Sequence, residues 1–262
     1  MNINLTGRTA LVCGSTQGIG KEAALQLAKS GARVVLASRN KDKLRNIKEE
    51  LENISQQNHD FICADFNNYK ILYKKVEEYV VKSNAIHILV NNTGGPNPGP
   101  LMESESRQFI ESFNRHLINN HNLSLLLIPG MKAESFGRII NVISTSVKQP
   151  IPGLGVSNTI RGAVASWAKT LSLEIASYGI TVNNILPGFT NTNRLKTIIE
   201  EISEKRNRSI NDVTMEMRNS IPSKRFAEPY ETAAAIVFLA SDQASYINGI
   251  NLPVDGGRTQ SL

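Results

Sequence analysis

Three glycines near the start of the chain, Gly14, Gly18 and Gly20, follow a short apolar run in a G-x-x-x-G-x-G spacing. A stretch with the pattern of a helix begins at Ile19, inside this loop. Backbone N–H groups at a helix start point outward and the helix dipole favours negative charge, so such a turn binds phosphate. Glycine also lets the backbone approach a pyrophosphate without a Cβ in the way. Glycines alone would indicate only a turn, but this strand–turn–helix context predicts a dinucleotide site.

The end of the second apolar run bears on the choice of dinucleotide. An NAD site commonly places a carboxylate there, which holds the ribose 2′-hydroxyl. Here the run ends in Ser38 and Arg39 without an acid. Because a guanidinium can form a charge-assisted fork to a 2′-phosphate, we expect NADP(H) in preference to NAD(H). The alternative is that Arg39 is a surface arginine at the start of a basic helix.

Length and composition limit the class of protein. The chain has 262 residues, 40% of them hydrophobic, which suffices for the core of one α/β domain. It has no apolar run of 18 residues and no apolar signal segment near Met1, so we expect no membrane span and a cytoplasmic location. Cys13 and Cys63 are expected to be buried, reduced thiols. The cysteines and histidines show no metal-ligand spacing, so no metal is expected.

The formal net charge is +6, from 29 basic and 23 acidic residues. Such an excess is compatible with nucleic acid or with an acidic ligand. The basic residues are scattered and mixed with acids, as in Lys41–Lys48, Lys74–Lys82 and Lys205–Arg208. We therefore expect solvated helix faces, and no nucleic-acid partner, since no DNA or RNA motif is present.

Apolar β-branched runs alternate with helical patterns along the chain. The expected strands are Thr9–Val12, Arg33–Ala37, Asp60–Cys63, His87–Val90, Arg138–Ile143, Thr181–Leu186 and Ile250–Val254. The expected helices are Ile19–Lys29, Lys41–Asn53, Tyr69–Lys82, Ser104–Met131, Gly155–Ser177 and Glu231–Ala240. Repeated β-α-β units form a parallel sheet with helices on both faces. We expect one domain over residues 1–262, an α/β doubly wound parallel sheet (Rossmann fold) of about seven strands.

One polar, charged insertion, Thr190–Ser220, follows the end of an expected strand. Ligands of doubly wound sheets bind outside the carboxyl ends of the strands. The insertion is therefore predicted to be a lid over a substrate cleft. The alternative is a helical excursion on the surface.

Four further motifs extend the pattern of the glycine loop. They are Asp65-Phe66, Asn91-Asn92-Thr93-Gly94, Pro187-Gly188 followed by Thr190 and Thr192, and Val254-Asp255-Gly256-Gly257. Together with the glycine loop, they resemble the short-chain dehydrogenase/reductase family, close to its 3-oxoacyl-acyl-carrier-protein reductase branch. The resemblance runs from about Leu5 to Gly257 and implies a Rossmann-type fold that holds a nicotinamide dinucleotide.

The resemblance also implies which residues contact the cofactor. The glycine loop would hold the pyrophosphate, the Asp-Phe pair the adenine, and the Pro-Gly segment the nicotinamide end. The implied cofactor-binding residues are Gly14, Ser15, Gln17, Gly18, Ile19, Gly20, Ser38, Arg39, Asp65, Phe66, Asn91, Gly94, Arg161, Pro187, Gly188, Thr190 and Thr192.

The catalytic positions depart from the family pattern of Asn, Ser, Tyr and Lys. Ser144 matches the serine, but the tyrosine position holds Ser157 and the lysine position holds Arg161. The asparagine position holds His116. The flanking pattern Ala163–Lys169 fixes this register. These four residues are the candidate catalytic residues that the resemblance implies.

Loss of the tyrosine removes the family's usual proton source. Reduction of a carbonyl needs a hydride and a proton, and the tyrosine supplies the proton after a lysine lowers its pKa from about 10. General acid–base help of this kind contributes roughly 10²–10⁴ in rate. The Ser157 hydroxyl is a weaker acid and too short to reach the same point. Arg161 can bind ribose hydroxyls but stays protonated.

His116 offers one replacement, because imidazole has a pKa near 6.5 and can donate a proton at neutral pH. One hypothesis is a proton route from His116 through water to the substrate. The alternative is a helix histidine that packs under the site without chemistry.

Two functions follow. The first is an NADP(H)-dependent oxidoreductase that acts on a small-molecule carbonyl or hydroxyl substrate with an atypical active site. The second is a catalytically silent NADP(H)-binding protein or partner subunit on the same fold; a chain that binds neither dinucleotide is a third.

The resemblance also implies a homo-oligomer, a dimer or tetramer, through the helices at Ser104–Met131 and Gly155–Ser177. Residues compatible with such a face, or equally with an internal core, are Leu125, Leu126, Ala163, Ala165 and Trp167.

Overall fold

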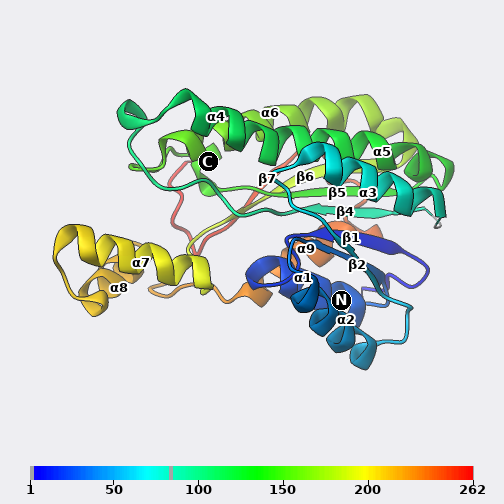
Figure 1. The fold of residues 1–262 in the computed structure, drawn as a ribbon, viewed down its shortest axis with the longest axis horizontal. Helices are drawn as coiled ribbons and strands as arrows, with labels where there is room; N and C mark the ends of the chain where they lie inside the picture. Colours follow the sequence, from blue (N-terminus) through cyan, green and yellow to red (C-terminus); the bar gives the residue numbers. More distant parts are fainter. Residues whose placement is uncertain (1–2, 83–84, 262) are drawn as a thin grey trace.

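The strand order of the sheet reverses between β1 and β4. In the computed structural model, which describes residues 3–82 and 85–261, seven strands form one parallel sheet in the order β3-β2-β1-β4-β5-β6-β7 (Figure 1). The strands are β1 Thr9–Cys13, β2 Arg33–Ser38, β3 Asp60–Cys63, β4 Ile88–Asn91, β5 Gly137–Val142, β6 Ile180–Pro187 and β7 Asn251–Val254. The predicted doubly wound α/β fold is confirmed. Its predicted extent, residues 1–262, includes 1–2, 83–84 and 262, which lie outside the described residues.

Helices cover both faces of the sheet (Figure 1). They are α1 Gly18–Lys29, α2 Lys41–Ile54, α3 Tyr69–Lys82, α4 Ser106–Phe113, α5 Asn119–Ala133, α6 Gly155–Ile175, α7 Asn193–Arg206, α8 Ile210–Asn219 and α9 Pro229–Ala240. Side chains of a strand point alternately to the two faces. In β1, Ala10 and Val12 join the core under α1, α2 and α9, whereas Leu11 and Cys13 join the core under α3, α5 and α6. Because all seven strands are parallel, their carboxyl ends lie at the same edge of the sheet.

The long helix expected over Ser104–Met131 is interrupted, so that prediction was wrong in part. α4 ends at Phe113, the turn Asn114–Ile118 is a π-helix, and α5 then continues to Ala133. A π-helical turn holds one extra residue per turn, and such turns are often found at functional sites. His116 lies in the middle of this turn, where the hydrophobic pattern alone gives no sign of the irregularity.

The insertion Thr190–Ser220 forms two helices, α7 and α8, which project from one side of the molecule (Figure 1). They are joined through Asn207, which adopts the left-handed conformation that ends α7. Their apolar faces form a small core of their own, which includes Leu195, Ile199, Val213 and Met217. The pair is therefore a packed unit at the carboxyl edge of the sheet.

Candidate active site and cofactor site

The glycine loop connects β1 to α1 at the point where the strand order reverses. Gly14 has a φ of +59°, and a Cβ there would lie 2.5 Å from the carbonyl oxygen of Asn92. Gly20 packs against the Gly14 carbonyl so closely that a Cβ would collide with it. The N-cap residue of α1, Gln17, makes no side-chain capping bond, and the first turn of α1 contains no acid. The loop thus presents free N–H groups at a helix start, which fits a dinucleotide pyrophosphate.

The residues expected around the ribose lie at the end of β2, next to this loop. Ser38 is buried, and its hydroxyl lies 3.1 Å from that of Thr16. Arg39 is exposed in the turn before α2. Its backbone carbonyl accepts a weak hydrogen bond from the thiol of Cys63.

Both cysteines are free thiols, but only Cys13 is buried. The prediction that both would be buried was wrong for Cys63, which is half-buried.

The other expected cofactor residues line the same edge. Asp65, after β3, is exposed and accepts from the backbone of Asn67, with Phe66 half-buried beside it. Gly94 is exposed, and a Cβ there would meet nothing within 4 Å. The end of β6 and the segment after it provide Pro187, Gly188, Thr190 and Thr192. Thr190 is buried, and its hydroxyl donates to the carbonyl oxygen of Gly188 at 3.2 Å.

A ladder of four asparagines crosses the sheet from β4 to β7. The side chain of Asn91 donates to that of Asn141 at 2.9 Å, Asn141 to Asn184 at 2.9 Å, and Asn184 to Asn251 at 2.8 Å. The four residues are direct neighbours in the strand register. Each link pairs an amide N–H with an amide oxygen, which lowers the cost of burying these polar groups, while the Oδ1 of Asn91 has no partner among the described residues. Asn91 therefore acts in the sheet as well as at the expected cofactor site.

The two serines of the candidate tetrad lie on either side of the loop that leads into α6. Ser144 follows β5, is half-buried, and its hydroxyl accepts from the backbone N–H of Ser146 at 3.1 Å. That oxygen keeps its own proton free to donate. Ser157 is half-buried in the first turn of α6. The structure therefore places a short hydroxyl where the resemblance expects a phenol.

Arg161 is buried one helical turn further along α6. Its Nη1 donates to the carbonyl oxygen of Val142 at 3.2 Å. Burial lowers the pKa of its guanidinium to about 10, so the group remains charged at neutral pH. Nη2 faces the loop after β4, since a Cβ at Gly95 would lie 3.6 Å from it.

His116 is buried under this loop. Its Nδ1 lies 2.7 Å from the hydroxyl of Thr93, and its Nε2 has no hydrogen-bond partner among the described residues. Burial, and then the charges of Arg161 and Arg115, hold the pKa of the imidazole well below its usual 6.5. The ring is therefore neutral at neutral pH. A neutral ring weighs against His116 as an imidazolium proton donor.

The start of the insertion Thr190–Ser220 is tied to the rest of the edge. From α7, the Arg194 guanidinium donates to the carbonyl oxygen of Pro96 at 3.0 Å. A Cβ at Gly18 would lie 3.1 Å from the Thr192 methyl group, so the start of the insertion lies over the glycine loop.

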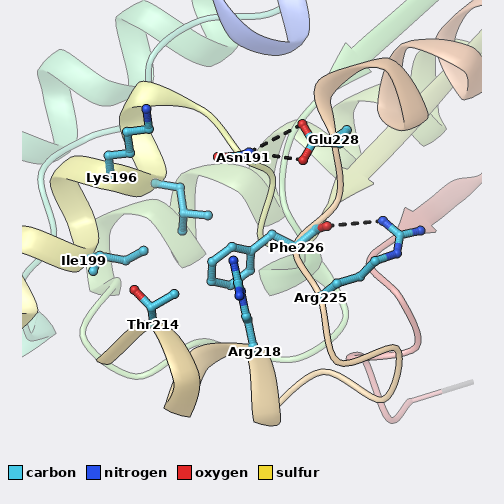
Figure 2. Close-up of a pocket in the computed structure, with 9 residues that line it drawn as sticks. Asn191, Lys196, Ile199, Thr214, Arg218, Arg225, Phe226 and Glu228 are labelled. Carbon is cyan, nitrogen blue, oxygen red and sulfur yellow. Dashed lines mark hydrogen bonds between the residues drawn. The ribbon is translucent and has the colours of Figure 1, made fainter. Parts of the chain in front are cut away.

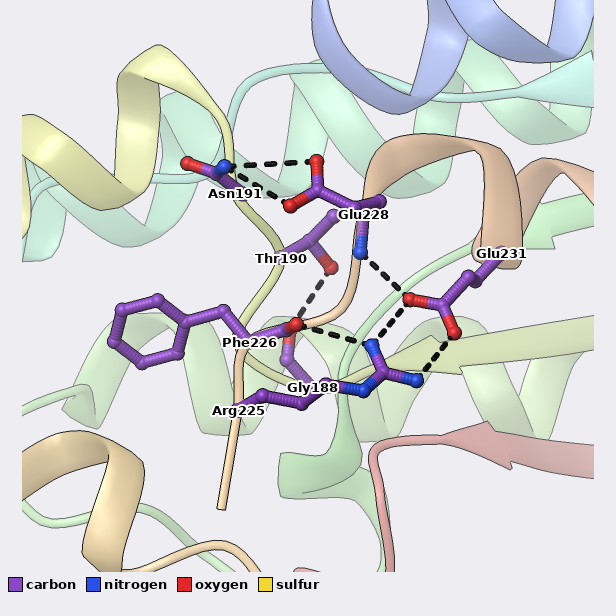
Figure 3. Close-up of polar contacts among 7 residues, drawn as sticks. All are labelled: Gly188, Thr190, Asn191, Arg225, Phe226, Glu228 and Glu231. Carbon is purple, nitrogen blue, oxygen red and sulfur yellow. Dashed lines mark hydrogen bonds and ion pairs between the residues drawn. The ribbon is translucent and has the colours of Figure 1, made fainter. Parts of the chain in front are cut away.

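The return segment after the lid is fixed by a polar cluster (Figure 3). Arg225 makes two hydrogen bonds of 2.6 Å to Glu231, which lower the pKa of that carboxyl to about 2. Glu228, at the start of α9, accepts from the side chain of Asn191. This cluster joins Asn191, at the start of the insertion, and the segment that returns from it to the start of α9.

A cavity of about 330 Å³ opens between α7, α8 and this return segment (Figure 2). Its lining residues are Asn191, Leu195, Lys196, Ile199, Thr214, Arg218, Arg225, Phe226 and Glu228. None of the four candidate catalytic residues lines it, so it is separate from the tetrad positions.

Within residues 3–82 and 85–261, no group of three or more His, Cys, Asp or Glu side chains could hold a metal ion. The same part of the chain contains no helix long and apolar enough to cross a membrane.

Comparison with known proteins decides the family. A family model described as enoyl-(acyl carrier protein) reductase matches residues 14–259. The chain belongs to the short-chain dehydrogenase/reductase family. Among curated members of the family, it is 32% identical to a 3-oxoacyl-[acyl-carrier-protein] reductase FabG of Buchnera aphidicola, over 97% of this chain and 98% of that protein.

Two other members of the short-chain dehydrogenase/reductase family are similar over their whole lengths. The NADPH-dependent reductase BacG of Bacillus subtilis is 30% identical over 98% of this chain and 100% of that protein. The solved structure of L-sorbose reductase from Gluconobacter frateurii, complexed with NADPH and L-sorbose, has a TM-score of 0.94 at 30% identity and covers 100% of both chains.

Three parts of the site were missed from the sequence. The first is the Thr93 hydroxyl on His116, the second the asparagine ladder, and the third the Arg194 contact to the loop after β4. The ladder left a signal, because an asparagine lies within or next to each of the last four expected strands. The other two depend on how distant segments meet, and no local pattern indicates them.

Proposed function

We propose that this short-chain dehydrogenase/reductase is an NADP(H)-dependent oxidoreductase that transfers hydride between the cofactor and a small-molecule carbonyl or hydroxyl substrate. The observation that carries the proposal is the glycine loop at the point of strand reversal, with Arg39 in place of an acid at the end of β2. The NADPH named for the Bacillus reductase and for the sorbose reductase structure supports the choice of cofactor.

Different residues at the carboxyl edge would bind different parts of NADP(H). The N–H groups at the start of α1 would bind the pyrophosphate, and Ser38 and Arg39 the 2′-phosphate. Asp65 and Phe66 would lie around the adenine. Asn91, Gly94 and the segment from Pro187 to Thr192 would line the nicotinamide half, next to Arg161.

When bound, the cofactor supplies or accepts the hydride. Ser144 would orient the substrate oxygen through its free hydroxyl proton. Arg161 would place a positive charge beside the oxygen that becomes negative, which stabilises the transition state. Ser157 leaves space where the family's tyrosine would stand. The proton route through His116 stays a hypothesis that a His116→Ala variant with unchanged turnover would exclude.

A second candidate is a silent NADP(H)-binding protein or partner subunit on the same fold. It is favoured by the specific combination of Ser157 with a neutral His116, since neither group is a strong proton donor at neutral pH.

The test pairs cofactor titration with turnover. NADPH binding, followed by nucleotide fluorescence, should be at least tenfold tighter than NADH binding, and Arg39→Asp should lose that preference because it removes a charge-assisted contact and adds a repulsive charge. Lys43→Asp, an exposed change on α2, is the matched control. NADPH oxidation with any member of a ketone, aldehyde and quinone panel supports the enzyme. Tight binding with no oxidation supports the silent protein, and binding of neither nucleotide contradicts both.

We also propose a homo-oligomer and a cytoplasmic location. Leu125 is half-exposed on α5, as a subunit contact requires, whereas Ala165 is buried and Leu126 and Trp167 pack against the internal cores. Two free thiols support a reducing compartment. Sedimentation of the purified chain would measure the assembly.

A further inference from the structure

Arg161 is a buried cation for which the described chain provides no counter-charge. Its side chain is 7% exposed, and one hydrogen bond, to the carbonyl of Val142, engages a group that has five N–H donors. No carboxylate among the described residues forms an ion pair with it, and burial alone accounts for the shift of its pKa. Burial of an unpaired charge is costly in a folded protein. The missing anion is therefore to be sought in a ligand.

His116 provides a second, independent sign of a missing partner at the same place. Its Nε2 is fully buried without a hydrogen-bond partner, and it lies close enough to Arg161 for that charge to depress its pKa. When the Thr93 hydroxyl donates to Nδ1, the neutral ring carries its hydrogen on Nε2. A buried N–H donor beside a buried cation is the arrangement that an anionic oxygen satisfies.

The loop after β4 contributes no side chain at Gly95, which faces Arg161. A Cβ at Gly95 would come to 3.6 Å from Nη2 of Arg161. The glycine therefore leaves this side of the guanidinium without a covering side chain. Ser144 follows β5, and Ser157 lies in the first turn of α6, one helical turn before Arg161.

We propose that Arg161, with His116, binds a carboxylate of the substrate, so that the substrate class is a carbonyl acid or hydroxy acid. This deepens, and rests on, the proposed oxidoreductase function, because it assigns the substrate of the same site. The carboxylate supplies the counter-charge that the described chain lacks, and the reducible carbon then lies next to the anchored group. An ester or amide of the same compound offers no charge and binds more weakly.

The experiment compares an acid with its neutral ester on the full-length protein. Benzoylformate and methyl benzoylformate are titrated by calorimetry, with and without saturating NADPH. We expect at least tenfold tighter binding of the acid. Arg161→Met should remove the difference, and Arg161→Lys, which keeps a cation, should retain part of it. Arg107→Met, an exposed change on α4, is the control that should leave it intact.

Equal binding of acid and ester, absence of binding by both at the solubility limit, or an unchanged acid preference in Arg161→Met would each overturn the proposal. A second readout needs no ligand. Arg161→Met should melt at a temperature equal to or above that of the parent, because it removes an unpaired buried charge, and a clear fall would contradict the absence of a counter-charge. Failure of the oxidoreductase function is separate: NADPH would then be left unoxidised by every member of the carbonyl panel, while the acid preference would persist in the cofactor-free protein.

Discussion

Two buried arginines lie at opposite ends of the sheet, and their surroundings differ. Arg138, at the amino end of β5, donates to the carbonyls of Gly137, Gly179 and Ser241 and faces Asp242 at 3.9 Å. Its guanidinium also stacks on Phe136. Arg161, at the carboxyl end, has the single carbonyl of Val142. The same residue type is satisfied by the protein at one end and left unpaired at the other.

The buried histidines repeat this contrast. At the amino end, Nδ1 of His87 accepts from the backbone N–H of Thr9, and Nδ1 of His59 accepts from that of Val34. At the carboxyl end, Nε2 of His116 has no partner among the described residues. Buried polar groups in folded proteins are almost always paired, so the unpaired arginine and histidine at the carboxyl end are the groups that we propose a ligand completes. The amino end of the sheet is built for stability and the carboxyl end for binding.

The largest effect is expected when Arg138, the arginine with three carbonyl acceptors, is removed. Arg138→Met should lower the free energy of unfolding by about 3 kcal/mol, because it leaves several buried carbonyls without donors. Urea unfolding measures this change. The matched variant is Arg161→Met, which should leave the stability of the ligand-free protein unchanged or raise it. If the two variants lose the same stability, the two ends do not differ as described.

A smaller effect is expected from pH. The pKa of folded His116 lies well below 6.5, whereas an unfolded histidine titrates near 6.5. Below that pH the unfolded chain binds more protons, so stability falls as pH falls. At pH 5.5, one unit below the pKa of the unfolded histidine, His116 should lower the free energy of unfolding by about 1.4 kcal/mol. Unfolding of His116→Asn between pH 7 and 5 should show a shallower decline.

The control for this pH effect is His87→Asn. Burial also lowers the pKa of His87, but less than that of His116. His87→Asn should therefore reduce the pH dependence of the free energy of unfolding less than His116→Asn does. Parallel profiles for the parent and His116→Asn would show that His116 is not held neutral.

The smallest effect is expected at the insertion Thr190–Ser220, which we propose to be a lid over the site. Arg194→Met removes the bond from α7 to Pro96, which is exposed, so stability should change by less than about 0.5 kcal/mol. The lid should open more readily, and stopped-flow release of NADPH should be a few times faster. Lys196→Met, an exposed change on the same helix, should leave release unchanged. Release that is equal in parent and Arg194→Met would show that the contact does not restrain the lid.

The sequence predicted the strands and most helices because their signals are local. Apolar runs such as those of β1 and β5 are buried on both faces, and amphipathic helices such as α2 repeat every three to four residues. The interrupted helix around His116 could not be predicted in this way. A π-turn keeps helical residue types and depends on how the helix packs against the loop after β4. The partial exposure of Cys63 likewise depends on its place at the end of an edge strand.

By itself, the sequence determined the parallel sheet, the glycine loop and Arg39 at the end of β2, since these follow from residue type and spacing along a continuous stretch. From its motifs we also predict that Ser157 and Arg161 stand in the positions of a tyrosine and a lysine. The tertiary structure alone decided that Arg161 is buried without a counter-charge from the described residues, and that His116 is neutral with no partner for its Nε2 among them. Both properties arise from desolvation and from neighbours on β4, β5 and α6, which are distant in the chain and meet only in the fold.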